Sequence, residues 1–134
     1  KSDITKNFKW YEAFSSVKLP NKRQYQKAIE PPEDYWENIS RVAAEAQKLR
    51  DYFKAPIGVN SWYRTPEFNS LPSTGGKPNS QHLTGLAVDL HPLFFISIKD
   101  FYRKAKEITA FKGFGIGKTF LHCDLREKET LWYY

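Results

Sequence analysis

Apolar residues recur at helical spacing in two stretches of the chain. From about Glu33 to Phe53 they fall three or four positions apart, and the pair Pro31-Pro32 precedes them, as is typical of a helix start. The stretch from Ser97 to about Phe111 combines the same spacing with helix-forming Lys, Ala and Glu. The pattern predicts two amphipathic helices, the first backing a sheet and the second crossing over it.

Three shorter stretches change to a period of two, which is typical of strands. They run from about Ile57 to Tyr63, from Leu86 to Leu90 and from Thr119 to Leu125. Successive side chains of a strand point to opposite faces, so Asp89 lies on the face opposite the apolar residues of its strand. The same reasoning puts His122 on the polar face of the third stretch.

These elements predict an α+β fold in which helices pack on one side of a small antiparallel sheet. With 134 residues the chain is long enough to bury a core without disulfides, and we expect a single domain over residues 1–134. Residues 1–30 carry a cluster of aromatic side chains, which predicts an arm that packs on this domain; a sugar-binding platform is the alternative. The chain starts without Met or an apolar signal segment, so we expect a mature or trimmed product.

Composition excludes several classes of protein. Hydrophobic residues make up 40% and aromatic residues 16%, which favours a globular protein over a disordered one. No apolar run approaches the ~18 to 20 residues of a membrane helix, so we expect no membrane span. The net charge is +6, but basic residues alternate with acidic ones, which favours an ordinary solvated surface over a nucleic-acid interface. The glycine-rich segment 113–117 lacks the pattern of a phosphate loop, and we expect its glycines to allow a close approach beside the third strand.

Polar residues between Ser80 and Asp89 form a pattern that is typical of a metal site. His82 and Asp89 stand seven positions apart, too far on one helix to share an ion, but Gly85 between them allows a sharp turn. Asp89 then points back toward His82, and His122 supplies a third ligand from its own strand. A His/Asp/His set leaves the fourth tetrahedral position of a zinc ion open for water, as in catalytic rather than structural sites.

Taken together, these residues resemble a known family. The pattern Ser80-x-His82-x-x-Gly85-x-Ala87-x-Asp89, followed by a strand with His122-x-Asp124, is similar to the zinc peptidases of the D-alanyl-D-alanine carboxypeptidase type, family M15. The upstream segment 61–69, Ser-Trp-Tyr-Arg-Thr-Pro-Glu-Phe-Asn, resembles the same family's Ser-x-Tyr-Arg-x-Pro-x-x-Asn element. The resemblance covers roughly residues 57–125.

The resemblance implies a fold like that of hedgehog proteins and D-Ala-D-Ala peptidases, with Zn²⁺ as the cofactor. By resemblance, His82, Asp89 and His122 are the zinc ligands. Arg64 would lie in the substrate cleft and bind a peptide carboxylate or polarise the scissile carbonyl, whereas an ion pair with Glu67 is the alternative. Members cut peptidoglycan stem peptides, and many are phage or bacterial cell-wall lysis enzymes. The resemblance therefore implies peptidoglycan peptides as partners and a secreted, periplasmic or phage-associated protein at the cell wall; we expect a monomer.

The chain departs from the family in one respect. Many relatives carry a Glu or Asp a few residues before the last zinc histidine as general acid or base, whereas segment 115–121 contains no acid. Asp124, on the same strand face as His122, is our candidate for this catalytic role, and a hydrogen bond between Asp124 and a metal ligand is the alternative. His91 has the strand parity to face the metal and is a second candidate, as proton carrier or spare ligand.

The leading functional hypothesis is a zinc metallopeptidase that hydrolyses peptide bonds in peptidoglycan stem or cross-link peptides, as a carboxypeptidase or an endopeptidase. The alternative is a non-catalytic, metal-containing module of the same fold that binds the cell wall or a protein, which the missing acid supports. A nucleic-acid binder, suggested by the charge alone, is a third hypothesis.

Overall fold

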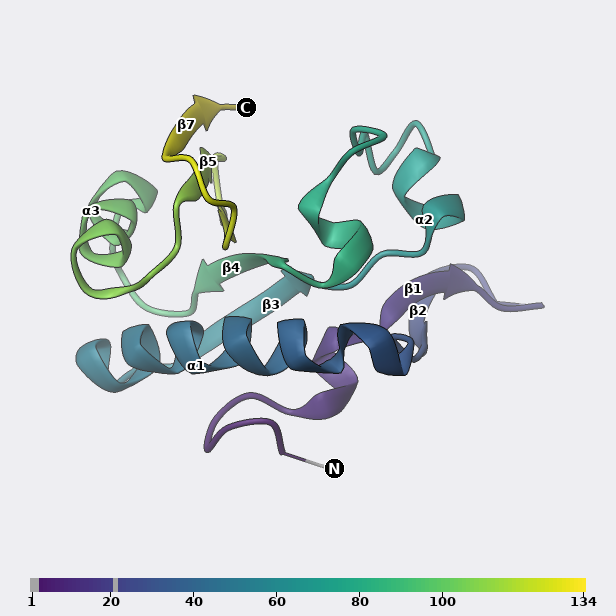
Figure 1. The fold of residues 1–134 in the computed structure, drawn as a ribbon, viewed down its shortest axis with the longest axis horizontal. Helices are drawn as coiled ribbons and strands as arrows, with labels where there is room; N and C mark the ends of the chain where they lie inside the picture. Colours follow the sequence, from purple (N-terminus) through teal and green to yellow (C-terminus); the bar gives the residue numbers. More distant parts are fainter. Residues whose placement is uncertain (1–2, 21) are drawn as a thin grey trace.

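A computed structural model describes residues 3–20 and 22–134. The described chain has the expected α+β fold, with a five-stranded sheet, a separate two-stranded sheet, and helices (Figure 1). In chain order the elements, with η for a 3-10 helix, are η1 (Trp10–Ala13), β1 (Ser15–Lys18), β2 (Tyr25–Ile29), η2 (Glu33–Tyr35), α1 (Trp36–Phe53), β3 (Ile57–Ser61), α2 (Pro66–Ser70), η3 (Gln81–Thr84), β4 (Ala87–Pro92), α3 (Ile98–Ile108), β5 (Gly113–Ile116), β6 (Leu121–Asp124) and β7 (Thr130–Tyr133).

The five-stranded sheet has the strand order β3-β4-β6-β5-β7. The pairs β3–β4, β4–β6 and β5–β6 are antiparallel, as expected, whereas β7 runs parallel to β5 and makes the sheet mixed at that edge. Asp89 of β4 and His122 of β6 are register partners. Two residues that are 33 positions apart in the chain therefore stand side by side.

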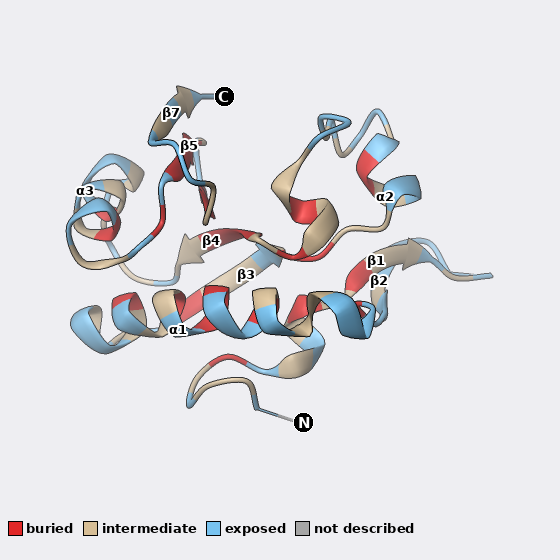
Figure 2. Cartoon of the chain, viewed as in Figure 1, coloured by how far each residue is buried: buried red, intermediate tan, exposed pale blue. Residues whose placement is uncertain are grey.

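The hydrophobic core lies between one face of the sheet and the helices α1 and α3. Figure 2 shows buried positions along the side of α1 that faces the sheet, and these residues are Ile39, Val42, Ala43, Ala46 and Leu49. The sheet contributes Val88, Leu90, Leu121 and Cys123, all without exposed surface. Because side chains alternate along β4 and β6, their opposite face is left for polar residues.

Both predicted main helices form, with shifted ends. The first begins with the single turn η2 before α1, and it ends where Lys54 takes a left-handed φ of 53°. The second begins after Ser97, whose hydroxyl accepts a hydrogen bond from the Asp100 backbone N–H at 3.1 Å. It ends before Phe111 because Thr109 is extended, with φ −115° and ψ 166°. Among the described residues, no helix is both long and apolar enough to cross a membrane.

The N-terminal arm packs on the body of the protein through Phe8. Its ring lies 6.4 Å from that of Trp62, and both rings are buried. The arm also contains the β1–β2 hairpin, which the sequence did not predict. The Ser15 hydroxyl accepts a hydrogen bond from the Thr65 backbone N–H at 3.0 Å, so the arm braces the segment that carries Arg64. Residues 1, 2 and 21 of the predicted arm lie outside the described part of the chain.

Candidate metal centre

His82 lies on η3, the short turn that leads into β4. The Ser80 hydroxyl caps this turn by accepting a hydrogen bond from the His82 backbone N–H at 3.1 Å. Gly85 ends the turn with a φ of 77°, in the left-handed region that favours glycine, as the sequence predicted. On the side chain, His82 Nδ1 lies 2.6 Å from the backbone oxygen of Trp62. Since a carbonyl only accepts, Nδ1 carries the proton and Nε2 keeps its lone pair.

The three predicted metal ligands converge on one point. Asp89 Oδ1 lies 3.2 Å from His82 Nε2 and 3.1 Å from His122 Nδ1. One ligand atom of each residue falls within 4.8 Å of the others, and all three residues are buried. Tetrahedral bonds of about 2.0 Å put neighbouring ligand atoms roughly 3.3 Å apart. These two separations are therefore close to those that a bound zinc ion requires.

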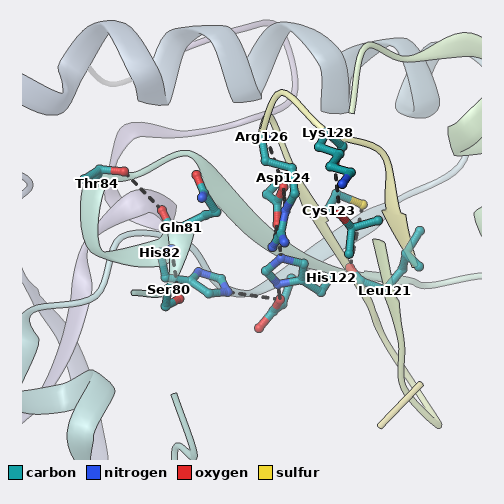
Figure 3. A network of polar contacts seen from close by, with 12 residues as sticks. Ser80, Gln81, His82, Thr84, Leu121, His122, Cys123, Asp124, Arg126 and Lys128 are labelled. Carbon is teal, nitrogen blue, oxygen red and sulfur yellow. Dashed lines mark hydrogen bonds and ion pairs between the residues drawn. The ribbon is translucent and has the colours of Figure 1, made fainter. Parts of the chain in front are cut away.

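The hydrogen-bonding pattern of His82, Asp89 and His122 favours a bound cation. His122 Nε2 lies 2.7 Å from Asp124 Oδ2 and donates its proton there (Figure 3), so Nδ1 of the neutral ring faces Asp89 with a lone pair. Two imidazole lone pairs and a carboxylate oxygen then face one another without a hydrogen to share. A metal ion satisfies all three groups, whereas a proton on His122 Nδ1 satisfies only His122 and Asp89 and leaves the lone pair of His82 Nε2 facing the same carboxylate oxygen. Burial lowers the pKa of His122, but hydrogen bonds to Asp124 and Asp89 outweigh it and leave that pKa raised.

The other two ligands are held in the forms that bind metals. Burial lowers the pKa of His82, although Asp89 opposes this effect, so the imidazole favours its neutral form. Burial alone would raise the pKa of Asp89, but His82 and His122 outweigh it and hold that pKa far below its usual range. The cluster therefore combines a neutral imidazole with an ionised carboxylate, as metal binding requires.

Asp124 lies directly behind His122 and is fully buried. Besides the hydrogen bond from His122, it accepts three from Arg126: from the backbone N–H to Oδ1 at 3.1 Å, from Nε to Oδ1 at 2.8 Å and from Nη2 to Oδ2 at 2.7 Å (Figure 3). Burial would raise the pKa of Asp124, but His122 and Arg126 outweigh it and keep that pKa well below its usual range. Gly113 on the adjacent strand leaves room for the pair, because a Cβ there would collide with Asp124 Oδ1. This geometry matches the alternative named from the sequence, in which Asp124 forms a hydrogen bond with the metal ligand His122. The catalytic role of Asp124 stays a prediction.

Arg64 lies just beyond the end of β3 and lines a cleft beside the cluster. Its Nη2 pairs with Asp89 Oδ2 at 3.1 Å, its Nε donates to Ser61 Oγ at 2.9 Å, and its Nη1 donates to Asn69 Oδ1 at 3.2 Å. Its ion-pair partner is thus Asp89, whereas the sequence had suggested Glu67 as the alternative. Arg64 orients one metal-ligand carboxylate, and its contact with substrate stays a prediction.

The cleft has a volume of about 590 Å³. Its walls come from the loop before η3, from the cluster, and from residues on and around β6 and β7. The lining residues are Arg64, Thr74, Gly75, Gly76, Lys77, Asn79, Ser80, Gln81, His82, Asp89, Phe120, His122, Arg126, Trp132 and Tyr134. Among these described lining residues, Asp89 is the one that carries a carboxylate.

His91 lies outside this arrangement. It shares the strand parity of Asp89, but its ring packs over its register partner Gly58 on β3, where a Cβ would collide with the imidazole. It is not among the residues that line the cleft. Within the described chain its Nδ1 has no hydrogen-bond partner. Its role as proton carrier or spare ligand stays a prediction.

Two residues beside the cluster, Arg126 and Trp132, were not assigned to the site from the sequence; for the aromatic segment 131–134 the sequence indicated docking on the body, with contact with a ligand as the alternative. Arg126 could have been found by extending the alternation of His122 and Asp124 by two positions. Trp132 lies with its ring centroid 4.9 Å from that of His122, and it arrives on β7, whose parallel pairing no local pattern indicates. Gly115 faces the indole, and a Cβ there would lie 2.6 Å from Trp132 Cε2. The expected close approach at the glycines is thereby explained.

Two histidines and an aspartate that can hold a metal ion, set beside a cleft, define a candidate metallohydrolase. The family model for Peptidase M15 matches residues 13–124, and the chain belongs to this peptidase family. The family resemblance seen in the sequence is thereby confirmed. A comparison with the curated proteins found no match. Membership implies a peptidase of a typically metal-dependent kind, and the cluster is a possible site for that metal.

Proposed function

We propose that this protein is a zinc-dependent metallopeptidase that hydrolyses peptide bonds in peptidoglycan stem or cross-link peptides. The observation that carries the proposal is the convergence of His82, Asp89 and His122 on one point beside a cleft, in a chain of the M15 family. A cleft of about 590 Å³ is in the range that takes a small ligand. The proposed substrate places the protein at the cell wall, as a secreted, periplasmic or phage-associated enzyme.

Bound zinc supplies Lewis-acid chemistry, because it polarises a carbonyl and lowers the pKa of water to about 7. The residues of the chain keep the site in order. The carbonyl of Trp62 and the carboxylate of Asp124 fix the two imidazoles, and Arg64 holds the second oxygen of Asp89. The charge of Arg64 at the cleft also favours an anionic group or a developing oxyanion of the substrate.

Transfer of a proton to the leaving amine needs a group that reaches the substrate. Asp124 is the predicted carrier, but its two oxygens are taken by His122 and Arg126, and it does not line the cleft. These contacts support a positioning role, in which Asp124 orients His122. The effect of Asp124→Asn on the pH dependence of kcat/KM separates the two roles, because only a proton carrier contributes a limb to that profile.

The proposal is tested by metal content and by turnover of the natural polymer. Protein purified without added metal is expected to contain about one zinc per chain. Release of soluble products from peptidoglycan should stop on chelation and return with zinc. Asp89→Ala should lose both metal and activity, whereas Asp100→Ala, at an exposed position of α3, should keep both. Full activity after chelation, or in Asp89→Ala, would contradict the proposal.

The choice between carboxypeptidase and endopeptidase depends on the C-terminus of the substrate. A carboxypeptidase needs a free C-terminal carboxylate near the scissile bond, and the charge of Arg64 in the cleft suits such a group. Stem peptides with free and amidated C-termini separate the two activities. Hydrolysis of the free form alone indicates a carboxypeptidase, and hydrolysis of both forms indicates an endopeptidase.

A non-catalytic, metal-containing module that binds the cell wall or a protein is the second candidate. It is favoured by the cleft lining, in which Asp89 is the one carboxylate among the described residues and is already a metal-ligand candidate. Zinc in the purified protein, together with retention on peptidoglycan and no release of products, would select this candidate over the peptidase.

A further inference from the structure

Cationic side chains outnumber carboxylates at the cleft. Arg64, Lys77 and Arg126 line it, whereas the carboxylates there are Asp89 in the lining and Asp124 behind Arg126. Arg64 is paired with Asp89, and Arg126 is paired with Asp124. The third cation, Lys77, therefore remains in excess, and a divalent metal on the cluster would add two further positive charges. Such a cleft attracts an anionic ligand.

Arg126 has one guanidinium nitrogen, Nη1, that is available to such a ligand. Its Nε and Nη2 donate to Asp124, while Nη1 has no hydrogen-bond partner among the described residues. The side chain is 30% exposed, and its guanidinium carbon lies 4.9 Å from the ring centroid of Trp132. Trp132 in turn contacts His122. The unpartnered Nη1 is thus held by two contacts within a short distance of the predicted metal site.

Lys77 stands on a loop that is tied to the same site. The backbone oxygen of Lys77 accepts a hydrogen bond from Asn69 Nδ2 at 2.8 Å, and Asn69 Oδ1 accepts one from Arg64. Gly76 packs so closely on Asn69 that a Cβ would collide with its amide oxygen. The Lys77 side chain is exposed, and within the described chain its ammonium has no ion-pair partner. Its charge is therefore available to a ligand in the cleft.

We propose that Arg126 and Lys77 bind a carboxylate of the peptide substrate beside the metal site, so that acidic peptides are preferred to their amidated forms. This inference rests on the proposed peptidase function and names the chemical class of its substrate. Arg126 Nη1 donates a charge-assisted hydrogen bond to the carboxylate, with the Trp132 ring beneath it, and Lys77 adds a second positive charge from the facing loop. A carboxamide keeps the shape of the carboxylate but loses this attraction.

The test uses a matched pair of stem peptides. They share one sequence, and the acidic residue next to the scissile bond carries either a free carboxylate or a carboxamide. The expected result is a kcat/KM about tenfold higher for the carboxylate form, arising mainly from a lower KM, since hydrogen bonds to charged groups have effects of this order. The preference should weaken as ionic strength rises.

Three variants test whether this preference for the carboxylate form arises at the cleft. The measured quantity is the ratio of kcat/KM between the two peptides, which is independent of any general loss of rate. Lys77→Gln should lower the ratio about threefold, and Arg126→Gln should bring it close to one, by the same reasoning on charged hydrogen bonds. Lys99→Gln removes the same charge from an exposed position on α3 and should leave the ratio unchanged.

The outcomes separate this inference from the proposed function. Zinc-dependent hydrolysis of both peptides at equal kcat/KM overturns the carboxylate site and leaves the peptidase standing. A preference that survives both Lys77→Gln and Arg126→Gln also overturns it. If neither peptide is hydrolysed, the peptidase proposal fails, and binding of the two peptides to the zinc-loaded protein is measured by calorimetry. Tighter binding of the carboxylate form then supports the site, and equal binding overturns it.

Discussion

At the scale of single residues, Asp124 shows how the chain supports a metal ligand from behind. Its two oxygens face a histidine on one side and a guanidinium on the other, with no access to solvent. A buried ion pair of this kind contributes little net stability, but removal of one partner leaves the other unpaired. The arrangement therefore serves the orientation of His122 more than the stability of the fold.

Asp124→Asn should lower zinc affinity by roughly 10- to 100-fold, because the amide orients His122 less well and makes its imidazole less basic. Competition with a chromophoric chelator measures this affinity. Asp100→Asn is the matched control, since Asp100 is exposed and pairs with Arg103 at the surface. Unchanged affinity in Asp124→Asn would remove the positioning role. Loss of activity at saturating zinc would instead favour the predicted role as proton carrier.

At the scale of elements, η3 depends on one glycine for its exit. Gly85 has a φ of 77°, and a Cβ at this position would lie 2.7 Å from Ile39 Cδ1 in the buried stripe of α1. The turn that presents His82 is therefore seated directly on the core helix. A side chain at this position would strain the backbone and push against α1 at the same time.

Gly85→Ala should destabilise the protein more than Gly75→Ala. Both glycines have a positive φ, 77° and 67°, so both substitutions incur the left-handed cost of about 1 to 2 kcal/mol. At Gly75 nothing lies within 4 Å of an added Cβ, whereas at Gly85 the contact with Ile39 adds an overpacking cost of about 1 kcal/mol or more. Urea unfolding of the two metal-free variants measures the difference, and equal loss of stability would exclude the contact with α1 as a cause.

Elements with their own periodic pattern were predictable, and elements that depend on distant partners were not. Strand parity correctly brought Asp89 and His122 to one face, because alternation is a local property of the backbone. The segment Gly113–Ile116 was expected to be a close approach but forms a strand, since its apolar residues face the core and its glycines face Trp132 and the Asp124–Arg126 pair. The parallel strand β7 carries no local signal of its partner, so the contact of Trp132 with His122 could not be foreseen.

At the scale of the whole molecule, the buried charges make stability depend on pH. The pKa values of Asp89 and Asp124 lie below their usual range in the folded protein. A lowered carboxyl pKa stabilises the fold above the ordinary value and loses this effect as pH falls below it. The lowered pKa of His82 likewise makes the fold less stable as pH falls below the ordinary pKa of histidine. The raised pKa of His122 has the opposite effect, because it stabilises the fold at low pH and this stabilisation is lost as pH rises.

Metal-free protein should therefore lose stability as pH falls from about 4 toward 2, where the two carboxylates take up protons. Each unit by which a pKa is lowered corresponds to about 1.4 kcal/mol. Thermal unfolding at a series of pH values measures the trend, and Asp124→Asn should flatten it. A melting temperature that is constant over this range, or that rises toward pH 2, would contradict the assignment of these buried carboxylates.

Cys123 can serve as a chemical probe of how often strand β6 opens. It is the single cysteine of the chain, lies between His122 and Asp124, and points into the core with no exposed surface. Burial raises the pKa of its thiol, so almost no reactive thiolate exists while β6 stays paired. An alkylating reagent can therefore modify Cys123 only during the moments when the strand detaches.

The rate of alkylation of Cys123, followed by mass spectrometry, should then measure how often the sheet opens at the metal site. We expect native protein to react far more slowly than unfolded protein, and added zinc to slow the reaction further by stabilising the closed state. Rapid modification of the native protein would show that β6 is already open. A residue that takes no part in the chemistry would thus report how long the metal ligands Asp89 of β4 and His122 of β6 stay together.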